Sequence, residues 1–251
     1  MEKKDHLKER IIVALDVENR EQALALASEL SEAQIFKVGL ELFAAEGPSL
    51  LREIQLLGKK IFLDLKLHDI PNTVAEAAKA GARHGARMMT IHASGGEEMM
   101  ARAVDAVASE AEKSHRARPL LLGVTILTSL KNEDLASIGM TAATSEQVLR
   151  LAGLAQKAGM DGIVSSAHEI EILRKELGRK LIIVTPGIRP TWATVHDQKR
   201  IMTPALALQK GADYLVVGRP ITRASSPREA FQKILQELEG AVDSSDRKNR
   251  P

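Results

Sequence analysis

Short runs of apolar residues alternate along this chain with longer stretches whose apolar residues recur at helical spacing. The short, β-branched runs predict eight strands, at residues 11–15, 35–38, 60–65, 88–92, 120–125, 162–165, 181–184 and 214–217. The longer stretches predict helices at 20–30, 48–57, 73–84, 97–111, 145–158, 168–177, 204–210 and 227–238. Strands and helices therefore alternate from one end of the sequence to the other.

Eight β-α units in 251 residues match the (β/α)8 or TIM barrel in both number and size. A doubly wound open sheet is the main alternative, but it usually has fewer strands, and no G-x-G-x-x-G follows the first strand here. We expect an α/β protein with one domain, the barrel at 11–239. A polar lead at 1–10 and a flexible polar tail at 240–251 are expected to flank it.

The composition narrows the class of protein. With 35 Lys+Arg against 33 Asp+Glu, the charge is too balanced for a nucleic-acid coat, so we expect no nucleic-acid partner. The absence of cysteine excludes disulfides, a thiolate nucleophile and a Cys-ligated metal. No run of about 18 apolar residues indicates a membrane span. We expect a cytoplasmic protein that does not enter a membrane.

Charged residues stand where the first three predicted strands end. Asp16 closes the first strand, Lys37 lies within the second, and the third delivers Asp64 and Lys66 with Asp69 just beyond. Each residue alone has a structural explanation, since Asp16 suits a helix cap and Lys37 can reach the surface along its own stem. Together they alternate in sign, which is what buried charges require, at the barrel end where active sites lie.

Other polar residues near strand ends remain open to two interpretations. Asp69 precedes Pro71, so it suits a cap for the next helix as well as a functional role, and Thr73 lies one helical turn further on. Thr128, after the fifth strand, suits ordinary turn chemistry or ligand contact. His92 is a candidate base or ligand, or a supporting hydrogen-bonded residue. No His/Asp/Glu set has the spacing of a metal site, so none is predicted.

The connections after the seventh and eighth strands suit a phosphate group. They carry Arg189 and the pair Gly218 and Arg219, and barrels often bind phosphate at this position. Arginine offers a forked pair of donors, and glycine lets the backbone approach the oxygens. The segment at 186–202 is long for such a connection, so we expect it to order over a ligand and to bring Gln198 to it.

A set of residues distributed over the whole barrel matches one known family. The set is Asp64-x-Lys66-x-x-Asp69-Ile70-Pro71-Asn72-Thr73 with Asp16, Lys37, Thr128, Arg189, Gln198, Gly218 and Arg219. With these residues the chain resembles the orotidine 5′-phosphate decarboxylase family over about 11–230. The resemblance implies conversion of orotidine 5′-phosphate (OMP) to UMP and CO2, the last step of UMP synthesis. It also implies a homodimer that uses no cofactor and no metal.

The resemblance further implies a role for each matching residue. Lys66 is the implied proton donor to C6 of the pyrimidine, within a catalytic network of Lys37, Asp64, Lys66 and Asp69 whose Asp69 comes from the partner subunit. The implied substrate-binding residues are Asp16 and Lys37 at the ribose, Asp64 beside Lys66, Thr73 from the partner subunit, Thr128 near the base, and Arg189, Gln198, Gly218 and Arg219 at the phosphate.

Three other functions remain alternatives. The nearest is a metal-dependent sugar-phosphate synthase or decarboxylase of the same superfamily, which also carries an Asp-x-Lys-x-x-Asp element. The continuation after Asp69, the presence of Lys37 and the long segment at 186–202 disfavour it. A Schiff-base aldolase that uses Lys66 or Lys37 is the second alternative. The third is a nucleotide-binding barrel without catalytic activity.

Overall fold

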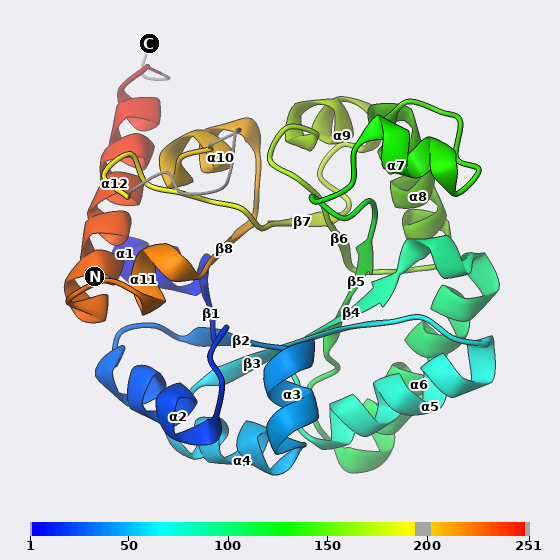
Figure 1. Ribbon diagram of the computed structural model, residues 1–251, viewed down its shortest axis with the longest axis horizontal. Helices are drawn as coiled ribbons and strands as arrows, with labels where there is room; N and C mark the ends of the chain where they lie inside the picture. The colour runs from blue at the N-terminus through cyan, green and yellow to red at the C-terminus, as the bar shows by residue number, and fades with distance from the viewer. Residues whose placement is uncertain (1, 194–201, 249–251) are drawn as a thin grey trace.

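A computed structural model describes residues 2–193 and 202–248 of the chain. Eight parallel strands close into a barrel in chain order, and β1 pairs with both β2 and β8 (Figure 1). The strands are β1 (Ile11–Ala14), β2 (Ile35–Gly39), β3 (Lys60–Leu67), β4 (Met88–His92), β5 (Leu120–Val124), β6 (Gly162–Val164), β7 (Ile182–Thr185) and β8 (Tyr214–Val217). The closed sheet confirms the predicted single-domain (β/α)8 barrel.

Helices surround the barrel on its outer side (Figure 1). They are α1 (Glu2–Glu9), α2 (Arg20–Glu29), α3 (Leu40–Glu46), α4 (Ser49–Leu56), α5 (Pro71–Arg83), the 3-10 turn η1 (Ala93–Gly95), α6 (Glu97–Ser114), α7 (Asn132–Ser137), α8 (Thr144–Lys157), α9 (Ile170–Leu177), α10 (Pro204–Lys210), α11 (Arg219–Thr222) and α12 (Pro227–Lys248). The sequence pattern missed the short helices α3, α7 and α11, because a periodicity of 3.6 residues is hard to detect over one or two turns. Over the described ranges, no helix has the length and apolar character needed to cross a membrane.

Alternation along the strands creates two separate apolar layers. In β1, Ile11 and Val13 face the helices and belong to the large outer core, whereas Ile12 and Ala14 belong to a smaller cluster inside the barrel. The inner cluster is completed by Ile35, Phe62, Met88, Leu122, Val184 and Val216. Because side chains alternate with a period of two, the next inward position after Ala14 is Asp16. The same alternation carries the inner layer from apolar to charged residues at the carboxyl ends of the strands.

Helices lie in both segments that flank the predicted barrel. In the expected polar lead, α1 packs against α12, and its Leu7 is buried in the outer core. The final helix α12 continues to Lys248, and Ala241 within it is buried. Residues 240–248 of the expected flexible tail are therefore helical in the structure, because apolar residues beyond 239 still find the core.

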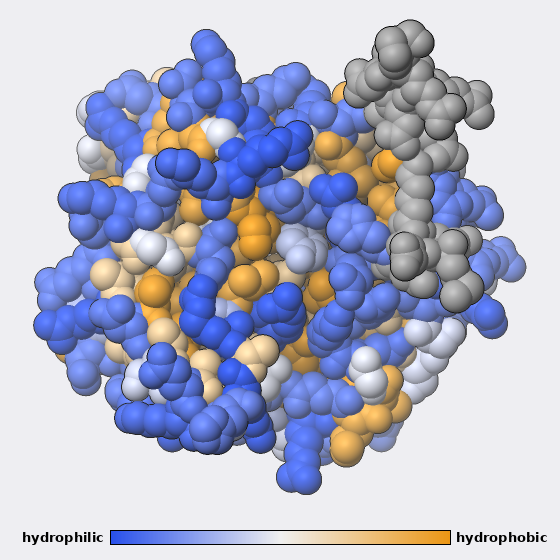
Figure 2. Space-filling view, turned by 180° about the vertical axis from the view of Figure 1, so that it is seen from behind, coloured by the Kyte–Doolittle hydropathy of each residue, from blue (hydrophilic) through white to orange (hydrophobic). Residues whose placement is uncertain are grey.

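Charged and polar side chains cover most of the face seen from behind the view of Figure 1, with apolar side chains visible between them (Figure 2). The exposed large apolar residues include Leu40 and Ile70, which are 65% and 67% exposed. Leu40 begins α3, directly after β2, and Ile70 immediately precedes α5, which follows β3. Both therefore lie beside the carboxyl ends of strands that carry the predicted charged residues.

Candidate active site

A cavity of about 290 Å³ opens at the carboxyl ends of the strands. Its apolar wall includes Val124 together with Phe62 of the inner cluster and Val164, which packs against that cluster. Eight of the predicted site residues also line it, namely Asp16, Lys37, Asp64, Lys66, Thr128, Arg189, Gly218 and Arg219. Residues that are distant in sequence thus meet at one barrel mouth, where enzymes of this fold carry their chemistry.

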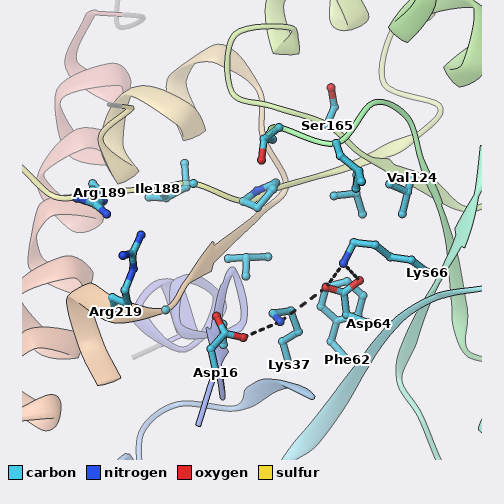
Figure 3. Close-up of a pocket in the computed structure, with 18 of the residues that line it drawn as sticks. Asp16, Lys37, Phe62, Asp64, Lys66, Val124, Ser165, Ile188, Arg189 and Arg219 are labelled. Carbon is cyan, nitrogen blue, oxygen red and sulfur yellow. Dashed lines mark hydrogen bonds and ion pairs between the residues drawn. The ribbon is translucent and has the colours of Figure 1, made fainter. Parts of the chain in front are cut away.

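Four of these residues form a continuous ionic network (Figure 3). Lys37 Nζ lies 3.0 Å from Asp16 Oδ1 and 3.7 Å from Asp64 Oδ2. Lys66 Nζ donates to both carboxylate oxygens of Asp64, at 2.9 Å each. The side chains of Lys37 and Asp64 are only 12% and 11% exposed, so their charges need these partners. The pairing expected from alternating sign is what the structure contains.

Glycine makes room for this network at two positions. A Cβ atom on Gly39 would lie 2.9 Å from Lys37 Nζ, and one on Gly218 would lie 3.3 Å from Asp16 Oδ2. Gly218 was predicted from its place beside Arg219, whereas Gly39 was not predicted. The sequence signal for Gly39 is its position two residues after Lys37, because residues two apart in a strand share one face.

The backbone at Lys66 departs from a regular strand. Leu63 pairs with Met89 and Leu67 with Ile91, so three residues of β3 lie opposite one residue of β4. Within this bulge Lys66 has a φ of +50°, a left-handed conformation that costs a non-glycine residue about 1–2 kcal/mol. The sequence placed Asp64 and Lys66 on a common face by simple alternation. The bulge is the additional feature that brings the ammonium back onto the Asp64 carboxylate.

Thr90 in β4 supports the bulge and was not predicted. It is 1% exposed, its hydroxyl donates to Asp64 Oδ1, and it accepts from the backbone N–H of Lys66, both at 2.9 Å. The available sequence signal was one threonine inside the apolar run of β4, two residues after the inward-facing Met88.

The predicted phosphate residues lie on the other side of the cavity. Figure 3 shows Arg189 and Arg219 together there, opposite Lys66. Arg189 is 6% exposed, and its backbone N–H donates to Met202 O at 3.0 Å. This bond joins the two described ends of the long segment after β7. The predicted residue Gln198 lies outside the described residues.

Asp69 and Thr73 do not line the cavity of their own chain. Both are exposed, in and just after the connection between β3 and α5. Asp69 Oδ1 accepts from the adjacent Ile70 N–H at 2.6 Å, while the N-cap of α5 is Ile70 and has no side-chain cap bond. The helix-cap interpretation of Asp69 is therefore wrong, because Pro71 shifts the helix start to a position that leaves Asp69 outside it.

His92 is half-buried at the end of β4, outside the cavity lining, with its ring 5.4 Å from that of His68. Burial lowers the pKa of His92, and the charges of His68 and Lys66 lower it further. The neutral form is therefore favoured, which suits a supporting residue. Among the residues that the structure describes, no three His, Asp or Glu side chains are grouped to hold a metal ion.

The fold and the site define a (β/α)8-barrel enzyme with ionisable side chains at the carboxyl ends of its strands. The model of the Orotidine 5′-phosphate decarboxylase / HUMPS family matches residues 9–234. The chain belongs to this family.

Two similar proteins bear the name orotidine 5′-phosphate decarboxylase. The one from Syntrophomonas wolfei is 51% identical over 234 residues, which is 92% of this chain and 98% of that protein. The one from Carboxydothermus hydrogenoformans is 49% identical over 240 residues, 95% of this chain and all of that protein. The crystal structure of orotidine 5′-phosphate decarboxylase from Lactobacillus acidophilus matches with a TM-score of 0.82 and 39% identity, over 92% of this chain and 99% of that one.

Proposed function

We propose that the protein decarboxylates OMP to UMP and CO2, the last step of pyrimidine nucleotide synthesis. The observation that carries this proposal is the ionic network ending at Lys66, which faces Arg189 and Arg219 across one cavity. The names of relatives that are 49–51% identical over nearly the whole chain support the same reaction. A cytoplasmic location, expected from the sequence, stays a prediction.

The proposed chemistry explains why lysine and aspartate alternate in the site. Loss of CO2 leaves an electron pair at C6 in the plane of the pyrimidine, where the π system cannot delocalise it. An ammonium about 4 Å from this charge contributes on the order of 4 kcal/mol at an effective dielectric near 20. Lys66 supplies that ammonium and then protonates C6. Asp64 holds Lys66 with both carboxylate oxygens, which keeps the donor in place before the charge develops.

The remaining lining residues account for the rest of the nucleotide. Asp16 and Lys37, paired at 3.0 Å, are proposed to hold the ribose hydroxyls, with Thr128 near the base. Arg189 and Arg219, with Gly218 and Gln198, are proposed to bind the phosphate through charge-assisted hydrogen bonds. Neither a metal nor a cofactor has a part in this proposed route.

We infer that the active protein is a homodimer with shared active sites. Asp69 and Thr73 are exposed and lie outside their own cavity, as expected of residues that serve a second subunit. The exposed apolar residues Ile70 and Leu40 lie near them, beside the ends of β3 and β2. Apolar side chains exposed next to functional residues favour a protein contact at this edge.

Loss of the orotate absorbance when OMP is mixed with the purified protein tests the reaction. Turnover is expected to continue with chelator present and to be lost in Lys66→Ala, since the charge that stabilises C6 is then missing. Lys79→Ala, which removes a partly buried lysine paired with Glu76 on α5, away from the cavity lining, is the matched control. Metal-dependent turnover of a sugar phosphate, with none of OMP, would instead assign the chain to the alternative function.

Mixing two inactive variants tests the shared site. Lys66→Ala and Asp69→Ala subunits are allowed to exchange after mild denaturation. If Asp69 acts across the dimer, each mixed dimer has one intact site, and a random mixture recovers about a quarter of wild-type activity. If Asp69 serves its own chain, no site in any dimer is intact and the mixture stays inactive.

A further inference from the structure

Thr90 carries the only side-chain hydroxyl of β4, and it is buried at 1% exposure among Met88, Met89 and Ile91. A hydroxyl in such an environment is unfavourable unless it is hydrogen-bonded. Both of its recorded partners belong to the ionic network: Asp64 Oδ1 accepts from it and the Lys66 N–H donates to it. The Thr90 hydroxyl is thus hydrogen-bonded to Asp64 and Lys66, the two residues on which the proposed chemistry depends.

The hydrogen bond from the Lys66 N–H to Thr90 replaces a backbone bond that a regular strand would make. Pairing between β3 and β4 is interrupted from Leu63 to Leu67, so the Lys66 N–H faces Thr90 where the ladder is irregular. The Thr90 side chain accepts from that N–H in place of a backbone carbonyl. Because a left-handed φ of +50° is unfavourable for lysine, a specific partner is needed to hold it.

The hydrogen bond from Thr90 to Asp64 fixes the orientation of a carboxylate that also binds the ammonium groups of Lys66 and Lys37. Asp64 Oδ1 accepts from both Thr90 and Lys66, while Oδ2 faces Lys66 at 2.9 Å and Lys37 at 3.7 Å. Thr90 is thus a second donor to Oδ1, and it restricts rotation of the carboxylate plane. Rotation would otherwise lengthen one of the two bonds to the Lys66 ammonium.

We propose that Thr90 is a positioning residue for the decarboxylation. It acts through Lys66 and Asp64 and is absent from the cavity lining, so it aligns the ammonium without touching substrate. This inference deepens the proposed function and rests on it. Thr90 is expected to matter for the reaction step and not for binding of the phosphate on the far side of the cavity, which depends on Arg189 and Arg219.

The test compares Thr90→Val, which keeps the shape and removes the hydroxyl, with Thr90→Ser, which keeps the hydroxyl. Thr90→Val is expected to lower kcat about 100-fold, because small misplacements of a reacting group have effects of that size. KM for OMP is expected to change by about threefold or less, and Thr90→Ser to keep kcat within about fivefold of wild type. If Thr90→Val does not fold, Thr90→Ala is measured in its place.

Thr125→Val is the matched control. Thr125 is 3% exposed at the end of β5, and its hydroxyl donates to Val164 O, away from the network. Unchanged kcat in Thr90→Val, an equal loss in Thr125→Val, or a rise in KM without a fall in kcat would each overturn the proposal. An inactive wild-type protein would instead show that the proposed function is wrong, and the role of Thr90 would fall with it.

Discussion

On the Lys66 side of the cavity, the charged side chains stand on or at the ends of β1, β2 and β3, whereas on the Arg189 side one stands on the connection after β7 and the other, Arg219, begins α11 after β8. The strand residues hold one another at 2.9–3.7 Å, and Thr90 adds bonds from the next strand. Bond making and breaking needs atoms held to a fraction of an ångström, which a closed sheet provides. Recognition of the proposed phosphate, remote from the reacting bond, tolerates a residue on a connection and one at the start of a helix, because binding residues often lie on segments that a rigid scaffold positions.

If the Lys66 side carries the chemistry and the Arg189 side mainly the binding, Lys66→Ala should have the largest effect on kcat. It removes both the stabilising charge and the proton donor, so kcat is expected to fall at least about 10⁴-fold. Affinity for UMP, which lacks the carboxylate, is expected to change far less. Single-turnover absorbance at saturating OMP and calorimetric titration of UMP measure the two quantities. A residual kcat above about 1% of wild type would contradict the assigned role.

Replacement of Arg219 by alanine is expected to have a smaller effect than Lys66→Ala, and to change both kcat and KM. Loss of a charge-assisted contact to phosphate should lower kcat/KM about 10²- to 10³-fold. Because binding energy from a remote group also helps to orient the reacting base, kcat should fall along with the rise in KM. Steady-state kinetics separate the two parameters, with Arg223→Ala, exposed at the end of α11, as the control. A pure rise in KM would show that phosphate binding and catalysis are not coupled.

The smallest expected effect is on thermal stability and concerns His92, at the end of β4. Because its pKa is lowered in the folded protein, unfolding takes up a proton as the pH falls below the ordinary histidine value of 6.5. Stability is therefore full above that value and declines as the pH falls toward the lowered pKa. His92→Asn should remove this part of the decline, about 1–3 °C in Tm.

Thermal unfolding between pH 8 and pH 5 measures this difference. His6→Asn, at an exposed position of α1, is the control for the substitution itself. An NMR titration that places the pKa of His92 at or above 6.5 would contradict the burial argument.

Alternation and strand ends were sufficient to predict the barrel and most of the charged residues that line its cavity. Asp16, Lys37 and Asp64 each continue an inward-facing row that begins with Ile12, Ile35 or Phe62, so period-two reasoning places them correctly. The bulge at Lys66 was beyond such reasoning, because its Lys66 N–H donates to the Thr90 hydroxyl, a partner 24 residues away in sequence. Asp69 and Thr73 show a different limit, because the sequence pattern put them beside the charged strand ends, whereas both lie outside the cavity lining of their own chain.

Closure of the barrel between β1 and β8 means that the two sides of the cavity are completed by opposite ends of the sequence. Asp16 and Arg219 line one cavity although about 200 residues separate them, and pairings of such long sequence separation form late. During synthesis on the ribosome, β1 to β3 with the residues of the ionic network emerge long before β8. The cavity that Asp16 and Arg219 line together can therefore be completed only after the last strand has closed the barrel.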